Sequence, residues 1–109
     1  MTTAPQPWKR KFRNQPVRTA EGYFASKKEL ADWQDLKLRE KAGQIDKLQR
    51  QVKFALTHNG VHICNYIADA VYFENGKRVV FDSKGFETPE FKLKKKLMLA
   101  LLNIHVVTA

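Results

Sequence analysis

The feature that most restricts the fold is the dipeptide Asn75-Gly76, which lies between two segments of alternating apolar residues. Asn-Gly is the preferred pair for the centre of a type I′ turn, because both central positions need a positive φ. Such a turn joins two antiparallel strands and fixes which residues oppose each other. The sequence therefore predicts a β-hairpin with a second strand at residues 78–84 and a first strand whose apolar residues are Ile63, Ile67, Val71 and Phe73.

The register of this hairpin brings two carboxylates together. Tyr72 faces Val79, and Asp69 faces Asp82 with their Cβ atoms about 5 Å apart. Lys84 lies on the same face, two residues from Asp82. Opposed like charges destabilise a sheet, and a divalent cation between them would remove the conflict. The alternative is that Asp82 caps the following turn while Asp69 points to solvent, and spacing alone leaves both open.

The other elements follow from periodicity and from start and stop signals. Ser26 begins a helix-like stretch to Ala42, and a period of two begins at Leu48. Thr88-Pro89 supplies an N-cap and a first helical residue, with Leu93, Leu97 and Leu101 expected to face the core. The first predicted element is a helix at 26–42. Three strands follow: one that begins at residue 48, one that includes 63–73, and one at 78–84. A helix that begins at Thr88-Pro89 and ends at 102 and a strand at 104–107 complete the chain. The order α-β-β-β-α-β predicts a single α/β domain over residues 23–109.

Glu29 has two possible roles on the first helix. At about 100° per residue it falls on the apolar side of the helix, from which a carboxylate can reach the sheet. Ser26-Lys27-Lys28-Glu29 is also an S-x-x-E capping box, in which Glu29 closes the helix start. The two roles are compatible, so both remain open.

The charge of the chain favours a polyanionic partner. The 109 residues include 20 Lys and Arg against 11 Asp and Glu, a net charge of +9. We expect residues 1–22 to form a flexible basic arm outside the domain, with phosphate-binding candidates Lys9, Arg10, Lys11, Arg13 and Arg18. Further candidates on the second helix are Lys92, Lys95 and Lys96. The alternative for both groups is a solvated surface.

Composition excludes several classes of protein. No apolar run approaches the ~20 residues that a transmembrane helix needs. A membrane-surface protein is poorly supported because the basic residues lack an accompanying exposed apolar face. Cys64 is the single cysteine, which excludes an internal disulfide and a multi-Cys zinc site. A reducing, cytoplasmic setting and a nucleic-acid partner are the resulting expectations.

Asp69 followed by Asp82-Ser83-Lys84 resembles the D-x(n)-(D/E)-x-K half-motif of the PD-(D/E)XK nuclease superfamily. The predicted order of elements and the helix-borne Glu29 agree with that resemblance. More specifically, the chain resembles DUF1064, a family of small phage and prophage proteins assigned to this superfamily. Ala68 stands where the superfamily motif has Pro, and Asp82 where Glu is commoner. The resembling stretches, within residues 24–106, are Phe24–Glu29, Gly43–Leu48, Tyr66–Asp69, Val79–Gly85 and Phe91–Leu97.

The resemblance implies a PD-(D/E)XK nuclease-like fold and metal-dependent hydrolysis of DNA. Asp69 and Asp82 would be direct Mg²⁺ ligands, together with the backbone carbonyl of Ser83, and Mn²⁺ would substitute. Lys84 would orient or deprotonate the attacking water. Glu29 would bind metal directly or through water, as part of a site with one or two metals.

The expected function is therefore a Mg²⁺-dependent DNA endonuclease, specific for DNA structure, like the Holliday junction resolvases used in phage recombination or packaging. Such an enzyme cuts two strands symmetrically and would act as a homodimer on branched DNA in the cytoplasm of a bacterial host. No membrane partner and no small-molecule cofactor is expected. The alternative is a module with a nuclease fold that binds DNA without cutting it.

Overall fold

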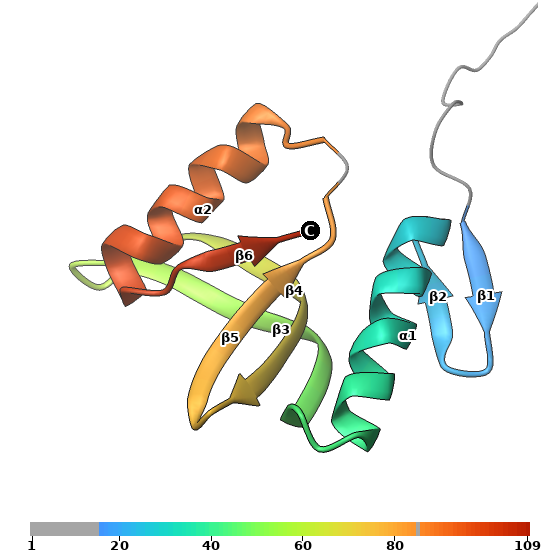
Figure 1. Ribbon diagram of the computed structural model, residues 1–109. Helices are drawn as coiled ribbons and strands as arrows, with labels where there is room; N and C mark the ends of the chain where they lie inside the picture. Colours follow the sequence, from blue (N-terminus) through green and yellow to red (C-terminus); the bar gives the residue numbers. More distant parts are fainter. Residues whose placement is uncertain (1–15, 85) are drawn as a thin grey trace, which may run out of the picture.

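The computed structural model describes residues 16–84 and 86–109 (Figure 1). A short hairpin comes first, with β1 at Val17–Thr19 and β2 at Gly22–Phe24. The helices are α1, Lys27–Lys41, and α2, Pro89–Leu102. The longer sheet contains β3 (Asp46–His58), β4 (Val61–Glu74), β5 (Lys77–Asp82) and β6 (Val106–Thr108). The predicted order α-β-β-β-α-β is confirmed from α1 onward, although β3 begins two residues before the predicted Leu48.

The protein is a small α/β domain with a mixed sheet in the order β3-β4-β5-β6. β3, β4 and β5 are antiparallel, whereas β6 is parallel to β5. A parallel neighbour needs a crossover connection, and α2 provides it. Val80 belongs to the core cluster that contains Met98 of α2, whereas Phe81 belongs to the cluster that contains Leu36 of α1. Because neighbouring residues of a strand point to opposite faces, the two helices cover opposite faces of the sheet.

The β4–β5 hairpin has the predicted turn and register. Asn75 and Gly76 have φ values of 54° and 76°, the left-handed conformation that a type I′ turn needs at both positions. Pairing then runs from Glu74↔Lys77 through Tyr72↔Val79 to Ala70↔Phe81. Asp69 and Asp82 follow this last pair, so the turn brings them to the same end of the hairpin, but the predicted opposed pair on one sheet face is not formed, because the ladder ends at Ala70↔Phe81 and Asp82 pairs with Thr108 of β6.

β3 and β4 change faces together in the middle of the sheet. Ala68 packs with the α2-side core and Ala70 with the α1-side core, although residues two apart in a regular strand share a face. Between the pairs Val52↔Ala68 and Arg50↔Ala70, Gln51 and Asp69 are left out of the ladder, and Gln51 has a φ of 54°. A symmetric irregularity therefore lies at Asp69 and reverses the side-chain alternation of both strands.

This reversal breaks the predicted period-two pattern of β4. Ile63 and Ile67 were grouped with Val71 as apolar residues of one regular strand, but they are 48% and 56% exposed. In the part of β4 that precedes Asp69, Tyr66 and Ala68 point into the core instead, whereas Val71, which follows Asp69, is buried. A single period-two pattern could not describe β4, because the strand changes face at Asp69.

The second helix begins as predicted but is rotated about its axis. The Thr88 hydroxyl accepts a hydrogen bond from the Phe91 amide at 3.1 Å, and Pro89 is the first helical residue. Phe91 and Met98 fill the α2-side core, whereas Leu93 is 57% exposed, so its predicted burial is wrong. Phe91 packs against Tyr66 of β4, and this contact turns Leu93 away from the sheet.

The expected boundary of the basic arm needs correction at its C-terminal end. Residues 17–22, assigned to the arm, form the β1–β2 hairpin with residues 23 and 24. The hairpin is attached through Phe24, which is fully buried, and the Arg50 guanidinium lies 3.7 Å from the centre of its ring. Arg50 also donates a hydrogen bond to the Tyr23 carbonyl. Residues 1–15 of the expected arm lie outside the described residues.

Among the described residues, no helix has the length and apolar character needed to span a membrane.

Candidate functional site

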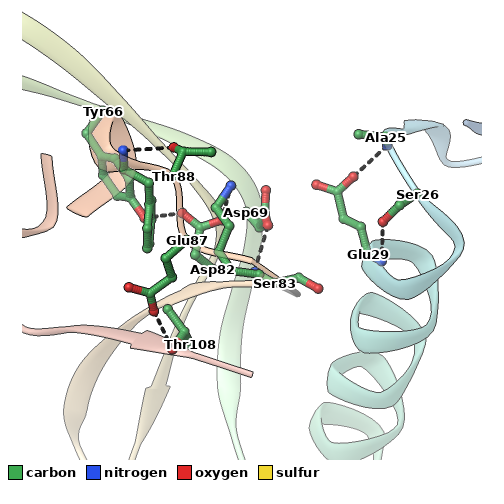
Figure 2. A network of polar contacts seen from close by, with 12 residues as sticks. Ala25, Ser26, Glu29, Tyr66, Asp69, Asp82, Ser83, Glu87, Thr88 and Thr108 are labelled. Carbon is green, nitrogen blue, oxygen red and sulfur yellow. Dashed lines mark hydrogen bonds and ion pairs between the residues drawn. The ribbon is translucent and has the colours of Figure 1, made fainter. Parts of the chain in front are cut away.

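The candidate site lies where β4 and β5 separate. After the pair Ala70↔Phe81, β5 continues alongside β6, with Asp82 opposite Thr108. The Asp69 carboxylate accepts a hydrogen bond from the Ser83 amide at 2.8 Å, so a side chain bonds the N–H at the end of β5 (Figure 2). Asp69 is half-buried at the irregularity of β4, and this position directs it to the end of β5.

Asp82 is buried on the α2 face of the sheet. Its side chain is 2% exposed, and the Tyr66 hydroxyl donates a hydrogen bond to Oδ2 (Figure 2). Lys84 Nζ lies 3.6 Å from Oδ1, an ion pair without hydrogen-bond contact. Within the described part of the chain, Oδ1 is buried and has no hydrogen-bond partner. A buried carboxylate oxygen in this state is costly unless a cation completes its surroundings.

The carboxyl groups influence each other's proton binding. Burial, followed by the neighbouring carboxyls of Asp82 and Glu29, raises the pKa of Asp69 to about 8, although the Ser83 amide opposes the rise. Burial and the Asp82 carboxylate raise the pKa of the Tyr66 phenol well above its ordinary value, so Tyr66 remains a donor. Excess negative charge therefore accumulates at the site when all carboxyls are ionised.

Glu29 makes the capping contacts and also faces the site. Its amide donates to the Ser26 hydroxyl at 3.1 Å, and its Oε1 accepts from the Ala25 amide at 2.6 Å. The side-chain bond reaches one residue further back than in a standard capping box, whose acceptor binds the Ser26 amide. Figure 2 shows the Glu29 carboxyl group on the side of α1 that faces Asp69 and Ser83.

Asp32 is a site residue that was not predicted from the sequence. The Ser83 hydroxyl donates a hydrogen bond to Asp32 Oδ2, and Lys28 Nζ lies 2.8 Å from the same oxygen. Asp32 follows Glu29 by three residues on α1, a spacing that places both on one side of a helix. This spacing from Glu29 is the sequence signal that could have identified Asp32. The bond from Ser83 joins α1 directly to the strand end that carries Asp82 and Lys84.

The two faces of the site enclose very different spaces. On the α1 side, a cavity of about 10 Å³ is bordered by Glu29, Asp69 and Ser83, with Arg50 and Trp33 also on its wall. This volume is close to the minimum for one water molecule. On the α2 side, a groove of about 300 Å³ is bordered by the following side chains: Asn65, Tyr66, Ile67, Asp82, Lys84, Thr88, Glu90, Phe91 and Lys94.

The donor set suits a hard cation in part. Glu29 and Asp69 offer carboxylate oxygens beside the small cavity, and Asp82 has an unpartnered oxygen on the other face. Mg²⁺ is commonly held by one or two carboxylates with water and substrate phosphate completing its shell. Within residues 16–84 and 86–109, however, no three His, Cys, Asp or Glu side chains are gathered so as to hold a metal ion. The carboxylates fit a site that water or phosphate oxygens would complete.

The predicted DNA-binding residues are dispersed. Lys9, Arg10, Lys11 and Arg13 lie outside the described residues. Arg18 is exposed on β1 and stacks on Tyr23, and Lys92 and Lys96 are exposed on α2. Lys95 is half-buried and pairs with Glu87 at 3.3 Å. Lys94, which was not among the predicted contacts, is the α2 lysine that borders the groove.

Comparison with known families gives one match. The model of the family described as "Protein of unknown function (DUF1064)" matches residues 9–105. Comparisons with curated proteins and with solved structures give no match. The matched range contains all the site residues on the sheet and on α1, from Glu29 to Lys84. The chain therefore belongs to the DUF1064 family.

Proposed function

We propose that the protein is a Mg²⁺-dependent DNA endonuclease with a PD-(D/E)XK nuclease-like domain. The observation that carries the proposal is the meeting of Asp69, Asp82 and Lys84 at the separated ends of β4 and β5, with Glu29 facing them from α1. A sheet gains no stability from two carboxylates at this point. Residues that break a local rule in this way often mark a functional site, and two carboxylates beside a lysine suit hydrolysis of a phosphodiester.

Each residue has a defined task under this proposal. Asp69 and Asp82 would hold the cation, with the Ser83 carbonyl and Glu29 as further ligands. A bound Mg²⁺ would lower the pKa of its water and stabilise charge on phosphate oxygens, and Mn²⁺ would substitute. The Tyr66 hydroxyl donates a hydrogen bond to the Asp82 carboxylate and so keeps that carboxylate in place. Lys84 would orient the attacking water and offset charge on the phosphate in the transition state.

The charge distribution and the family resemblance support DNA as the substrate. The net charge is +9, and the basic side chains Lys92 and Lys96 are exposed on the helix that borders the groove. The resemblance to phage proteins supports a structure-specific enzyme, like a Holliday junction resolvase, acting in a bacterial host cell. Symmetrical cutting of a junction would need a homodimer.

A second candidate is a DNA-binding module that does not cut. It is favoured by the absence of a three-ligand metal cluster among the described residues and by the ion pair between Lys84 and Asp82. A buried carboxylate with an unpartnered oxygen argues against it, because a binder of phosphate gains nothing from that charge.

One gel experiment separates the two candidates. Linear duplex, single strand, flap and four-way junction would be incubated with the full-length protein, with and without Mg²⁺. Mg²⁺-dependent products that disappear in Asp82→Asn, but persist in Asp35→Asn on the exposed side of α1, support the nuclease. Shifted bands without products on every substrate would identify a binding module.

A further inference from the structure

Four side chains that border the α2-side groove contact one another in a closed circuit. The Tyr66 hydroxyl donates a hydrogen bond to the Asp82 carboxylate, and Lys84 Nζ lies 3.6 Å from the other oxygen of that carboxylate. Lys84 Nζ also lies over the aromatic ring of Phe91, 5.0 Å from the ring centre. The rings of Phe91 and Tyr66, whose centres are 6.3 Å apart, complete the circuit.

Phe91 is the member of this circuit to which the proposed function gives no task. Its backbone is fixed at the start of α2, where the Phe91 amide donates to the Thr88 hydroxyl at 3.1 Å. The residue is 7% exposed and belongs to the α2-side core, so packing fixes its ring. An ammonium group within about 6 Å of a ring centre is attracted by the negative face of the π system. Phe91 therefore offers Lys84 a fixed and neutral partner.

Lys84 needs such a partner because its contact with Asp82 is weak and depends on charge. The lysine side chain is a flexible four-carbon stem, and that of Lys84 is 34% exposed, so it is free to take other rotamers. The distance of 3.6 Å to Asp82 Oδ1 is too long for a hydrogen bond. If Asp82 holds a cation, as proposed above, that positive charge opposes the attraction between Lys84 and the carboxylate. The attraction to the Phe91 ring does not depend on the carboxylate and is kept.

We infer that Phe91 is a positioning residue, which keeps the Lys84 ammonium group beside Asp82. Lys84 is the group that would act on the substrate, and Phe91 acts only through it. The inference rests on the proposed function in taking Lys84 as a reacting group, but the contact can be tested in the free protein. Lys95 Nζ also lies over this ring, at 5.7 Å, but it pairs with Glu87 and is not among the described residues that border the groove.

The first test follows Lys84 itself, by NMR of protein that carries ¹³C-labelled lysine, in EDTA and without DNA. Protons over the face of an aromatic ring are shifted upfield, and the Cε–H signal of Lys84, identified by its loss in Lys84→Ala, should show this shift. Phe91→Leu should move the signal towards that of a free lysine, because leucine has no ring. Met98→Leu, a conservative change in the same core and on the same helix, should leave the signal in place. An unmoved Lys84 signal in Phe91→Leu would overturn the inference.

A second variant separates the charge distribution of the ring from its bulk. Trifluorophenylalanine, introduced in place of Phe91 by stop-codon suppression, keeps the aromatic packing but withdraws electron density from the ring face. It should lower the rate of single-turnover cleavage by about fivefold, the worth of one partly enclosed cation–π contact. If this variant gives the wild-type circular dichroism spectrum and cuts at the wild-type rate, Phe91 is a packing residue only.

The last measurement asks whether Phe91 acts through Lys84. In the Lys84→Ala background, Phe91→Leu should not lower the cleavage rate further, because the side chain that it positions is gone. A further fall as large as in the wild-type background would contradict the inference. If the wild type cuts no DNA, the NMR result still decides the contact. A Lys84 signal that moves in Phe91→Leu and not in Met98→Leu would then support the positioning and refute the nuclease alone.

Discussion

At the separated ends of β4 and β5, the face towards α1 is closed whereas the face towards α2 is open. The closed side has room for about one water between Glu29 and Asp69, and the open side is a groove of about 300 Å³ beside Asp82. Both sides hold carboxylates, but only the groove adds Lys84 and Lys94. Under the proposed function, the cation would lie between the two sides, held by Asp69 from the closed side and Asp82 from the open side, and the substrate would enter through the groove.

The strongest test of this arrangement removes one carboxylate from each side. Asp69→Asn and Asp82→Asn should each abolish cleavage, because each removes a proposed metal ligand, while DNA binding stays intact or becomes tighter as repulsion with phosphate falls. Isothermal titration with Mg²⁺ or Mn²⁺ would measure metal binding in the wild type and little in either variant. If both variants still bound metal and cut DNA, neither side would be the site.

Lys84 belongs to the open side, and its substitution should change the rate of cleavage rather than the affinity for Mg²⁺. Lys84→Ala should lower turnover by ~10²-fold or more, because its charge acts mainly in the transition state. Single-turnover cleavage would be compared with Mg²⁺ affinity measured on the same preparation. A variant that cuts at nearly the wild-type rate would remove Lys84 from the mechanism.

Without metal, the closed side should make the protein less stable as the pH rises. The pKa of Asp69 is about 8 in the folded protein and about 3.9 in an unfolded chain, so the folded state binds more protons between these values. The free energy of unfolding should therefore fall as the pH rises through this window, by about 1–2 kcal/mol after allowance for solvent screening. Urea unfolding in EDTA would measure it.

Two additions sharpen the pH experiment. Asp69→Asn should flatten the pH dependence, which assigns the effect to Asp69 rather than to another ionisable group. Added Mg²⁺ should stabilise the wild type most at the alkaline end, because the ligand must be deprotonated to bind metal. A wild-type stability that rises with pH in EDTA would contradict the burial of excess negative charge at this site.

The smallest expected effects separate the two roles of Glu29. Ser26→Ala should cost about 1 kcal/mol of stability through loss of the cap, with Mg²⁺ affinity unchanged. Glu29→Gln keeps an acceptor for the Ala25 amide but removes the charge, so stability should change little while Mg²⁺ affinity falls. Thermal unfolding and metal titration of both variants give the answer. Unchanged metal affinity in Glu29→Gln would leave Glu29 as a cap alone.

Local signals in the chain were sufficient for much of the site. The Asn75-Gly76 turn set the register that brings Asp69 beside Asp82, and the capping sequences placed the starts of both helices. These features depend on residues close together in sequence, where turn geometry and hydrogen bonding act without help from the rest of the fold. Glu29 was recognised for the same reason, because its capping box is local.

Tertiary packing decided the rest. The reversal of faces occurs in β3 and β4 at the same point, at Gln51 and Asp69, and each face packs against a different helix. The exposure of Ile67 therefore could not follow from the pattern of one strand. The bond from Ser83 to Asp32 and the groove position of Lys94 depend on how α1 and α2 dock, and side chains far apart in sequence set that docking. The sequence by itself determined the hairpin and the register of its pairs as far as Ala70↔Phe81, because a two-residue turn fixes register locally. Which face each carboxylate serves was decided only when the two helices packed on the sheet.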